Sequence, residues 1–421
     1  MGLIAGISIL NEKWLKIPND IALLLFSFII CAALQGASHL FSAPELHGML
    51  AGLEGFQFES YLLDGVLCFM LFAGAGKVRF GKFTSNLKAI TLLSFLTTAV
   101  SAILYGILFF ALSCLLEWPL DIWLCILLGC IVSPTDPIAA TGIMNKLGMS
   151  KNVTTVIESE SLFNDGMGVV LFAFVKGLVA HAGRENFVLL MLREVAGAAA
   201  VALSVSFLLF ELFKRSRKPM NHIFISLFAV SSIYVICEGW GFSGVIASVI
   251  CGMYFSYATE KISRYRQVVD PGDTYAQFWD SIDGILNSVL FVLIGISVVR
   301  LPLLQNLWII AAAAVVIGLV SRAAGVALPA LLSPDRVIPG GYSLWEFVAL
   351  MTWSALKGGL SLALVLSTRA FLKPELYNIL LDAAYVTIFF TVVVQGLTTK
   401  RVYRLIERHK ARRIQKEGLT R

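Results

Sequence analysis

SPTDPIAATGIMNKLGMSKNVTTVIESESLFNDG, residues 133–166, places acids in surroundings that are otherwise apolar enough to span a bilayer: Asp136, Glu158, Glu160 and Asp165. Charged groups at membrane depth are costly, so by default they mark an ion or proton pathway. Pro134 and Pro137 disfavour helix just before each ring, which predicts an unwound break inside a membrane span. The stretch therefore predicts a protein that carries a small cation; a kinked helix with one fortuitous acid is the alternative.

The composition excludes a soluble globular protein. Hydrophobic residues make up 58% of the 421 residues and charged residues only 14%, against about 25% charged residues in soluble domains. Apolar runs recur almost end to end, and most match the ~20 residues that cross a bilayer as a helix. These features predict an all-α polytopic membrane protein. The net charge of +6 is assigned to loops on one side of the membrane, so it does not predict a nucleic-acid partner.

Thirteen apolar segments follow one another along the chain. They cover roughly residues 1–10, 20–37, 59–76, 86–115, 120–147, 153–180, 186–213, 221–238, 241–257, 274–300, 303–332, 341–371 and 376–403. The first is too short to span, so either it is a partial helix or the natural start lies upstream of Met1. We therefore predict about thirteen transmembrane segments, the first one short.

Basic residues concentrate in alternate loops. Lys and Arg occur in four loops and in the tail, and they are absent from intervening loops at 38–58, 116–119 and 239–240. Because basic loops favour the cytoplasm, we expect the carboxyl terminus there. The predicted organisation is a single transmembrane domain at 1–403 and a short basic cytoplasmic tail at 404–421. The tail is either an ordinary solvated end or a segment that lies on anionic lipid.

A second break is predicted in the segment 341–371, where Lys357, Gly358 and Gly359 interrupt an apolar run. Two interrupted segments in corresponding places of two halves indicate an inverted-repeat transporter. The interrupted segments are the fifth and the twelfth, and this odd offset makes the two repeats run in opposite directions. We therefore predict inverted repeats with two broken helices that cross. Close helix packing at a Gly-Gly pair is the alternative.

The predicted binding site combines Asp136, on the unwound stretch, with Asp165 on the next helix. A rise of ~1.5 Å per residue from Val153 places Asp165 about 18 Å deep, near the middle of a ~30 Å core. Two carboxylates at one depth form a hard oxygen site for a small cation or for protons. Thr135 can add its carbonyl and hydroxyl oxygens, and Ser161, one turn before Asp165, can add a hydroxyl.

A proton and a cation compete for a buried carboxylate, because each neutralises the charge that burial disfavours. Such competition, at a site that is reached alternately from each side, is sufficient for antiport. Asn164 stands beside Asp165 where a second acid would add charge. This pattern predicts one-for-one exchange with no net charge moved.

Three further charges are interpreted as structural. At ~1.5 Å per residue, Glu160 lies ~11 Å and Arg322 ~15 Å from the cytoplasmic face, which favours a buried ion pair between their helices. Lys357 is expected to offset the negative end of the half-helix before it. A functional role is the alternative for both basic residues.

The remaining ionisable residues receive weaker assignments. Asp64 lies either along the pathway or near the outer interface. Asp280 and Asp283 form either a cation-attracting cytoplasmic vestibule or a polar helix start. Snorkelling or interfacial positions near span ends are expected for Lys176, Glu211, Glu346 and Asp382. The seven cysteines are expected to be small buried residues, because none has the spacing of metal ligands.

At SPTDPIAAT and IESESLFNDG the sequence resembles the cation:proton antiporter-1 family, the NhaP-type and eukaryotic sodium/proton exchangers. Further stretches similar to this family are LCFMLFAGAGKV at 67–78, GFSGVIASVICGMYFS at 241–256, SRAAGV at 321–326 and LKGGLSLAL at 356–364. The resemblance covers nearly the whole chain. Two positions depart from the family pattern: Lys357 replaces a frequent arginine, and Ala73 replaces a frequent glutamate.

The resemblance implies an NhaA/NhaP-like fold and a secondary active antiporter, not an enzyme, that exchanges Na+ (or Li+) for H+ without a cofactor. It implies Na+ and proton binding at Asp136 and Asp165, supported by Thr135, Ser161, Asn164, Glu160 and Arg322. The Asn-Asp pair is the family's mark of electroneutral exchange. A homodimer is also implied, with a moving core bundle near 120–180 and 303–371. The expected location is the bacterial inner (plasma) membrane.

Rival functions remain at this point. K+ in place of Na+ fits the same residues, because selectivity depends on cavity geometry. A sodium-coupled solute symporter would need a roomy polar pocket, for which no residues are found. Residues 241–244 match the GxSG pattern of intramembrane serine proteases, but the only histidine after Ser243 is His409 in the tail. A nucleophile without a base is not activated.

Overall fold

The computed structural model describes residues 1–41, 58–77, 87–118, 120–136, 151–179, 189–190, 192–216, 218–266, 272–297, 307–338 and 341–419. Within these ranges every regular element is a helix, and no strand is present. The all-α prediction is confirmed.

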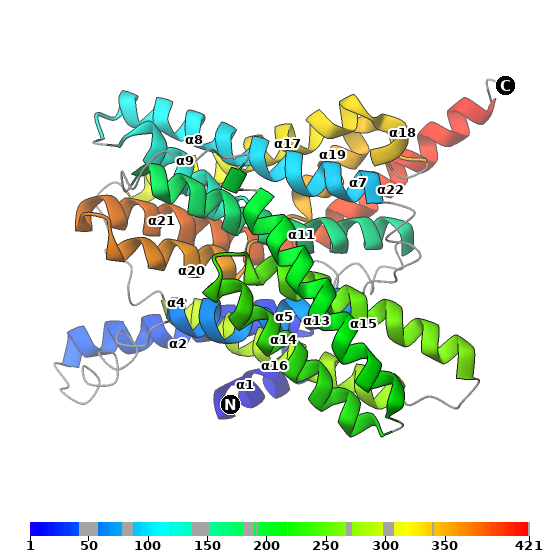
Figure 1. Ribbon diagram of the computed structural model, residues 1–421. Coiled ribbons are helices and arrows are strands. Elements are labelled where there is room, and N and C mark those ends of the chain that lie inside the picture. The colour runs from blue at the N-terminus through cyan, green and yellow to red at the C-terminus, as the bar shows by residue number, and fades with distance from the viewer. Residues whose placement is uncertain are drawn as a thin grey trace.

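The helices form two bundles, one above the other in Figure 1. The upper bundle contains α7 (Leu87–Thr91), α8 (Thr98–Leu115), α9 (Ile122–Val132), α11 (Lys151–Val179), α17 (Leu307–Leu332), α18 (Pro334–Val337), α19 (Leu344–Trp353), α20 (Gly359–Ser367), α21 (Pro374–Phe390) and α22 (Gly396–Leu419). The lower bundle contains α1 (Gly2–Leu10), α2 (Asn19–Phe41), α4 (Phe58–Ser60), α5 (Leu67–Lys77), α13 (Gly197–Arg215), α14 (Pro219–Gly239), α15 (Gly244–Arg266) and α16 (Gly272–Ile296). Short π-helical turns join several of them, among them η2 (Tyr61–Val66), η3 (Leu92–Thr97), η4 (Leu192–Ala196) and η7 (Thr391–Gln395).

Each of the thirteen predicted segments overlaps described helices. Eight described helices are long and apolar enough to cross a membrane, and shorter apolar helices accompany them. The first helix is longer than predicted, because a π-helical turn, η1 (Asn11–Leu15), continues α1. The number of membrane crossings stays a prediction.

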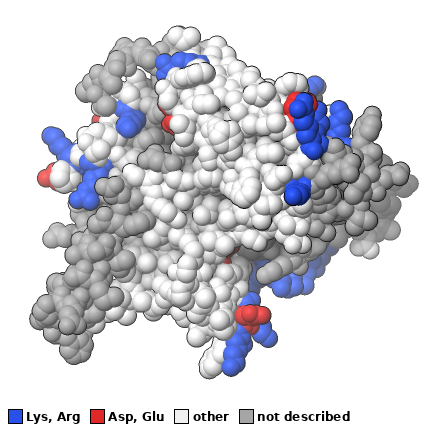
Figure 2. Space-filling model, turned by 60° about the horizontal axis from the view of Figure 1, so that its bottom comes forward, with Lys and Arg blue, Asp and Glu red and all other residues white. Residues whose placement is uncertain are grey.

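The outer surface is largely apolar. Figure 2 shows a face whose centre carries few charged side chains, while most Lys and Arg lie towards its margins. Large apolar side chains are exposed along α13 and α14, among them Phe207, Leu208, Phe224 and Phe228. Soluble proteins rarely expose apolar area on this scale, whereas lipid covers it in a bilayer. The chain is an integral membrane protein.

The two predicted breaks lie against each other. α9 ends at Val132 and α19 at Trp353, and the non-helical residues that follow each end meet. The Asp136 N–H donates to the Leu356 carbonyl over 2.8 Å, so one break satisfies a backbone group that the other has freed. The second half of the fifth segment is predicted within residues 137–150, which lie outside the described residues.

Gly358 permits this crossing. A Cβ built at Gly358 would lie 2.7 Å from Asp136 Oδ2 and 2.9 Å from its Cβ, closer than real side chains approach. A Cβ at Gly359 would lie 2.1 Å from Leu290 Cδ1 of α16. The Gly-Gly pair therefore serves the crossing with its first residue and close helix packing with its second, so both sequence interpretations hold.

Gly358→Ala is expected to separate the two breaks and to cost about 1–3 kcal/mol of stability, as overpacking in a tight core does. We also expect a loss of transport, because Asp136 is displaced. Gly177→Ala on α11 is the matched control, since a Cβ there meets nothing within 4 Å. Thermal unfolding of both purified variants in detergent, with unfolding of the control unchanged or shifted upwards, checks the expectation; equal unfolding temperatures would contradict it.

The carboxyl-terminal helix is clamped to the start of α19. α22 runs without interruption across the predicted boundary at 403/404. Its Arg413 Nη2 donates to Glu346 Oε2 over 3.0 Å, and His409 Nδ1 lies 2.8 Å from Glu346 Oε1. Glu346 also accepts from the Ser343 N–H in a capping box that begins α19. Glu346 is therefore buried and anchors the tail, whereas the sequence indicated a snorkelling or interfacial side chain.

Arg413→Ala is expected to cost about 1–3 kcal/mol, the range for a hydrogen bond to a charged group, because it leaves the buried Glu346 carboxylate short of donors. Arg412→Ala removes the same charge from the next, exposed position of α22 and is expected to be silent. Limited proteolysis of the tail provides the measurement. Faster cleavage only in the Arg413 variant supports the clamp, and equal rates in both variants contradict it.

Candidate ion-binding site

α11 supplies two adjacent pairs of polar side chains at helical spacing. Glu160 and Asn164 lie one turn apart, and so do Ser161 and Asp165, which places all four on neighbouring strips of one face. All four are buried; Glu160 is only 1% exposed and Asp165 8%. Buried polar groups need partners, and the unwound end of α9 provides most of them.

Asn164 holds the unwound backbone at Thr135. The Thr135 N–H donates to Asn164 Oδ1 over 3.1 Å, and Asn164 Nδ2 donates to Thr135 Oγ1 over 2.7 Å. The Ser161 hydroxyl donates to the Thr135 carbonyl. Because that proton is committed, the Thr135 hydroxyl donates to Ser161 Oγ in the 2.8 Å contact between them.

These hydrogen bonds leave coordinating capacity on three oxygens. A hydroxyl has one proton and two acceptor lone pairs, and a carbonyl has two lone pairs. Thr135 Oγ1 accepts one bond, Ser161 Oγ accepts one, and the Thr135 carbonyl accepts one from Ser161. With respect to the described residues, each oxygen therefore keeps one lone pair with which it can bind a cation.

Glu160 and Arg322 form a buried two-pronged ion pair between α11 and α17. Arg322 Nη1 lies 2.9 Å from Glu160 Oε1, and Nη2 lies 3.0 Å from Oε2. Asn164 Nδ2 also donates to Glu160 Oε1 over 3.1 Å. The pair that the two depths favoured is present, and it fixes the amide that holds Thr135.

Asp136 and Asp165 line one cavity of about 50 Å³ between the two bundles. The upper bundle lines it with Asp136, Asp165 and their neighbours in the breaks and on α11. Among the described residues, the lower bundle contributes Gly74 and apolar side chains, Leu62, Leu67, Met70, Leu71 and Leu290. A water needs about 10–15 Å³, so the cavity has room for a small cation with part of its hydration shell. Carboxylate, hydroxyl and carbonyl oxygens are the ligands that hard cations prefer.

Lys357 approaches the break from the opposite side. Its Nζ donates to the Ser133 carbonyl over 3.0 Å, and its N–H donates to Thr391 Oγ1 over 3.0 Å. Ser133 follows the last residue of α9. The ammonium therefore offsets the negative end of α9, whereas the sequence indicated the half-helix that precedes Lys357.

The sequence of this chain is similar to a known protein family. The family described as "Sodium/hydrogen exchanger, transmembrane" matches residues 2–405. The chain belongs to the sodium/hydrogen exchanger family. The exchanger is 29% identical to the Na(+)/H(+) antiporter NhaP of Pseudomonas aeruginosa over 412 residues, with 93% of each chain covered. It is 30% identical to the Na(+)/H(+) antiporter NhaH of Halobacillus dabanensis, with 92% of each covered.

The exchanger's fold also matches a solved structure, that of the sodium proton antiporter MjNhaP1 from Methanocaldococcus jannaschii. The TM-score is 0.74, and the match covers 96% of this chain and 95% of the other at 19% identity. The family prediction and the predicted antiporter fold are both confirmed.

Several residues outside the cavity differ from their sequence assignments. Asp382, expected near a span end, is completely buried in α21 and has no hydrogen-bond partner among the described residues. Asp280 and Asp283 both pair with Lys77; Asp283 is buried, whereas Asp280 is exposed and lines an open cavity near α1, so a vestibule there stays a prediction. The side chain of Asp64 lies outside the described residues.

The structure also tests the sequence assignments of Ser243 and of the seven cysteines. Ser243 Oγ accepts from the Ile246 N–H at the start of α15, which is a helix-capping role. Cys114 is exposed, so its buried assignment is wrong, whereas the other six cysteines are buried.

Sequence reasoning missed the polar residues behind the crossing. Thr352, Thr391 and Gln395 line a second cavity together with Lys357 and Arg322. The available signal was Gln395, an amide within an otherwise apolar run.

Proposed function

We propose that this exchanger is a secondary active antiporter that exchanges Na+, or Li+, for H+ across the membrane. The observation that carries the proposal is the shared position of Asp136 and Asp165 on one cavity between the two bundles. The names of the NhaP and NhaH relatives agree with this ion pair. Membership of a transporter family also argues against an enzymatic role.

The proposed ligands of Na+ are the Asp136 and Asp165 carboxylates, with oxygens from Thr135 and Ser161. The three oxygens with spare lone pairs support this set. Protonation of the carboxylates removes the negative charge that a cation needs, so one site holds protons or the cation but not both. No cofactor takes part in the proposed cycle.

Alternating access is proposed to result from movement of the upper bundle against the lower one. The candidate ligands named here belong to the upper bundle, whereas the described lower-bundle residues that line the cavity are Gly74 and apolar side chains. An apolar wall can slide past the site without breaking a bond to the ion. Ala73 agrees with this arrangement, because the described α5 residues that line the cavity, Leu67, Met70, Leu71 and Gly74, carry no ligand atom.

Asn164 supports electroneutral one-for-one exchange. Its Nδ2 donates to both Thr135 and Glu160, and a carboxylate at this position has no proton with which to replace those bonds. The site therefore has one titrating acid fewer. We further infer a homodimer in the bacterial inner (plasma) membrane, with the carboxyl-terminal tail in the cytoplasm.

Proton movement in proteoliposomes tests the function. A pH-sensitive dye follows an imposed proton gradient while Na+, Li+ or K+ is added, with and without a valinomycin clamp of the membrane potential in K+. We expect Na+ and Li+ to dissipate the gradient at rates that the clamp does not change. We also expect the Na+ concentration for half-maximal rate to rise as pH falls, because protons compete for the same carboxylates.

Each other outcome selects a different function. Equal rates with K+ would replace the ion and keep the mechanism. A rate that depends on membrane potential alone would refute electroneutral exchange. Proton movement that requires an added solute would favour a sodium-coupled symporter, and its complete absence in a folded protein would refute antiport.

A further inference from the structure

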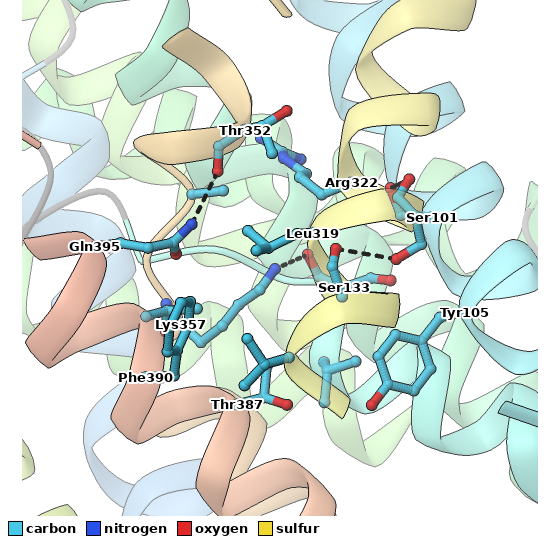
Figure 3. Close-up of a pocket in the computed structure, with 16 residues that line it drawn as sticks. Ser101, Tyr105, Ser133, Leu319, Arg322, Thr352, Lys357, Thr387, Phe390 and Gln395 are labelled. Atoms are coloured by element: carbon cyan, nitrogen blue, oxygen red, sulfur yellow. Dashed lines mark hydrogen bonds between the residues drawn. The ribbon is translucent and has the colours of Figure 1, made fainter. Parts of the chain in front are cut away.

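A second cavity of about 20 Å³ lies behind the crossing, inside the upper bundle (Figure 3). Its lining comes from α8, α9, α17, α19, α21, η7 and the two breaks, and it shares no residue with the cavity at Asp136 and Asp165. Ser133 and Lys357 face it, whereas the residues that follow them, from Pro134 and Gly358 onwards, face the ion site. The crossing therefore separates two chambers.

Polar atoms in this rear cavity lack partners. Four such atoms, Tyr105 Oη, Arg322 Nε, Thr352 Oγ1 and Gln395 Oε1, are buried and make no hydrogen bond within the described part of the chain. Gln395 Nε2 donates to the Thr352 carbonyl over 3.4 Å, which directs Oε1 to the other side of the amide. Burying polar groups without partners destabilises the folded protein, so a polar occupant is expected in the cavity.

The four atoms together select the chemistry of that occupant. Arg322 Nε only donates, Gln395 Oε1 only accepts, and the Thr352 and Tyr105 hydroxyls do either. A cation cannot accept from Arg322, and an anion cannot donate to Gln395. A neutral molecule that both donates and accepts suits all four atoms, and the volume exceeds the ~10–15 Å³ that one water needs.

We propose that the rear cavity binds water. This water hydrates the Lys357 ammonium on the side of the crossing away from the ion site. Lys357 Nζ has three protons, and within the described residues it donates one to the Ser133 carbonyl. Bound water accepts another and links the ammonium to Arg322, Thr352 and Gln395. The bound water thus solvates the Lys357 ammonium on the side away from the ion. The rear cavity lies inside the upper bundle and would move with it in the proposed cycle.

Synchrotron hydroxyl-radical footprinting tests this without any transport measurement. Radicals formed from bound water label side chains next to it even when bulk solvent is excluded. Tyr105 lines the rear cavity and is 1% exposed, whereas Tyr385 is 2% exposed and does not line it. In the wild-type protein we expect labelling of Tyr105 well above that of Tyr385. Equal labelling of the two tyrosines would overturn the proposal.

Two variants connect the water to the named atoms. Thr352→Val with Gln395→Met removes two of the four unpartnered atoms at nearly constant size, and we expect Tyr105 labelling to fall to the level of Tyr385. Ser321→Ala is the matched control, because this serine lines the same cavity but its hydroxyl donates to the Gly318 carbonyl over 3.1 Å. Unchanged labelling in the double variant would overturn the proposal. So would a bromide peak in the cavity by anomalous diffraction, which would identify an anion.

Discussion

Asp165→Asn is expected to reduce cation-driven proton movement to the level of empty liposomes, while the protein stays folded. The substitution keeps the shape of the side chain but removes the charge that binds Na+ and the group that takes up the proton. Asp165 lines the cavity between the bundles and is only 8% exposed. Bulk water therefore cannot take over the role of its carboxylate as cation ligand and proton acceptor. The dye assay with Na+ and Li+ measures the effect.

Glu211→Gln provides the control for this experiment. Glu211 lies near the end of α13, where it pairs with Lys214 at 43% side-chain exposure, far in sequence from the cavity residues. The same change of charge is expected to leave exchange intact there. Full activity of Asp165→Asn would remove the central carboxylate from the proposed mechanism, and Asp136 alone would then have to bind both ions.

Arg322→Ala is expected to destabilise the folded protein by about 3–5 kcal/mol, because it leaves the buried Glu160 carboxylate without its cation. Replacing both partners, with Glu160→Leu and Arg322→Met, is expected to cost much less than the sum of the single changes, since no unpaired charge stays buried. Thermal unfolding of the two single variants and the double variant gives the coupling energy.

The exposed pair Lys214–Glu211 is the reference for that cycle. Its side chains are 41% and 43% exposed, and exposed ion pairs contribute only about 0–1 kcal/mol. A coupling energy for Glu160 and Arg322 as small as that of this pair would contradict a structural role. Loss of transport in the double variant without loss of stability would show that Asn164, released from Glu160, no longer positions Thr135.

The sequence predicted best what local chemistry determines. Two prolines around Asp136 and two glycines after Lys357 located both breaks, because these residue types limit helix directly. The helical rise from the span ends placed Glu160 and Arg322 at similar depth, which was enough to indicate their pairing. The repeat of acids and small polar residues on α11 indicated the site in the same way.

The sequence did not predict contacts between residues that lie far apart in the chain. Asp382 lies near the start of a predicted segment and was assigned to the interface, but packing of α21 on α17 and α20 buries it. Lys357 binds Ser133 rather than its own half-helix because the two breaks cross at this point. The partners of Glu346 lie in the tail, more than sixty residues away, and no local pattern indicates such a distance.

Because α22 is uninterrupted and bonded to α19, the carboxyl-terminal residues are fixed to the upper bundle. At ~1.5 Å per residue its 24 residues extend about 36 Å, and Glu346 ties them to α19 in the upper bundle. The exposed Ile414 directly follows the clamped Arg413, so it is expected to move with the upper bundle in the proposed cycle. A dye there and a second dye at the end of α13, in the lower bundle, would report the transport cycle as changes in energy transfer, in real time and without touching the ion site.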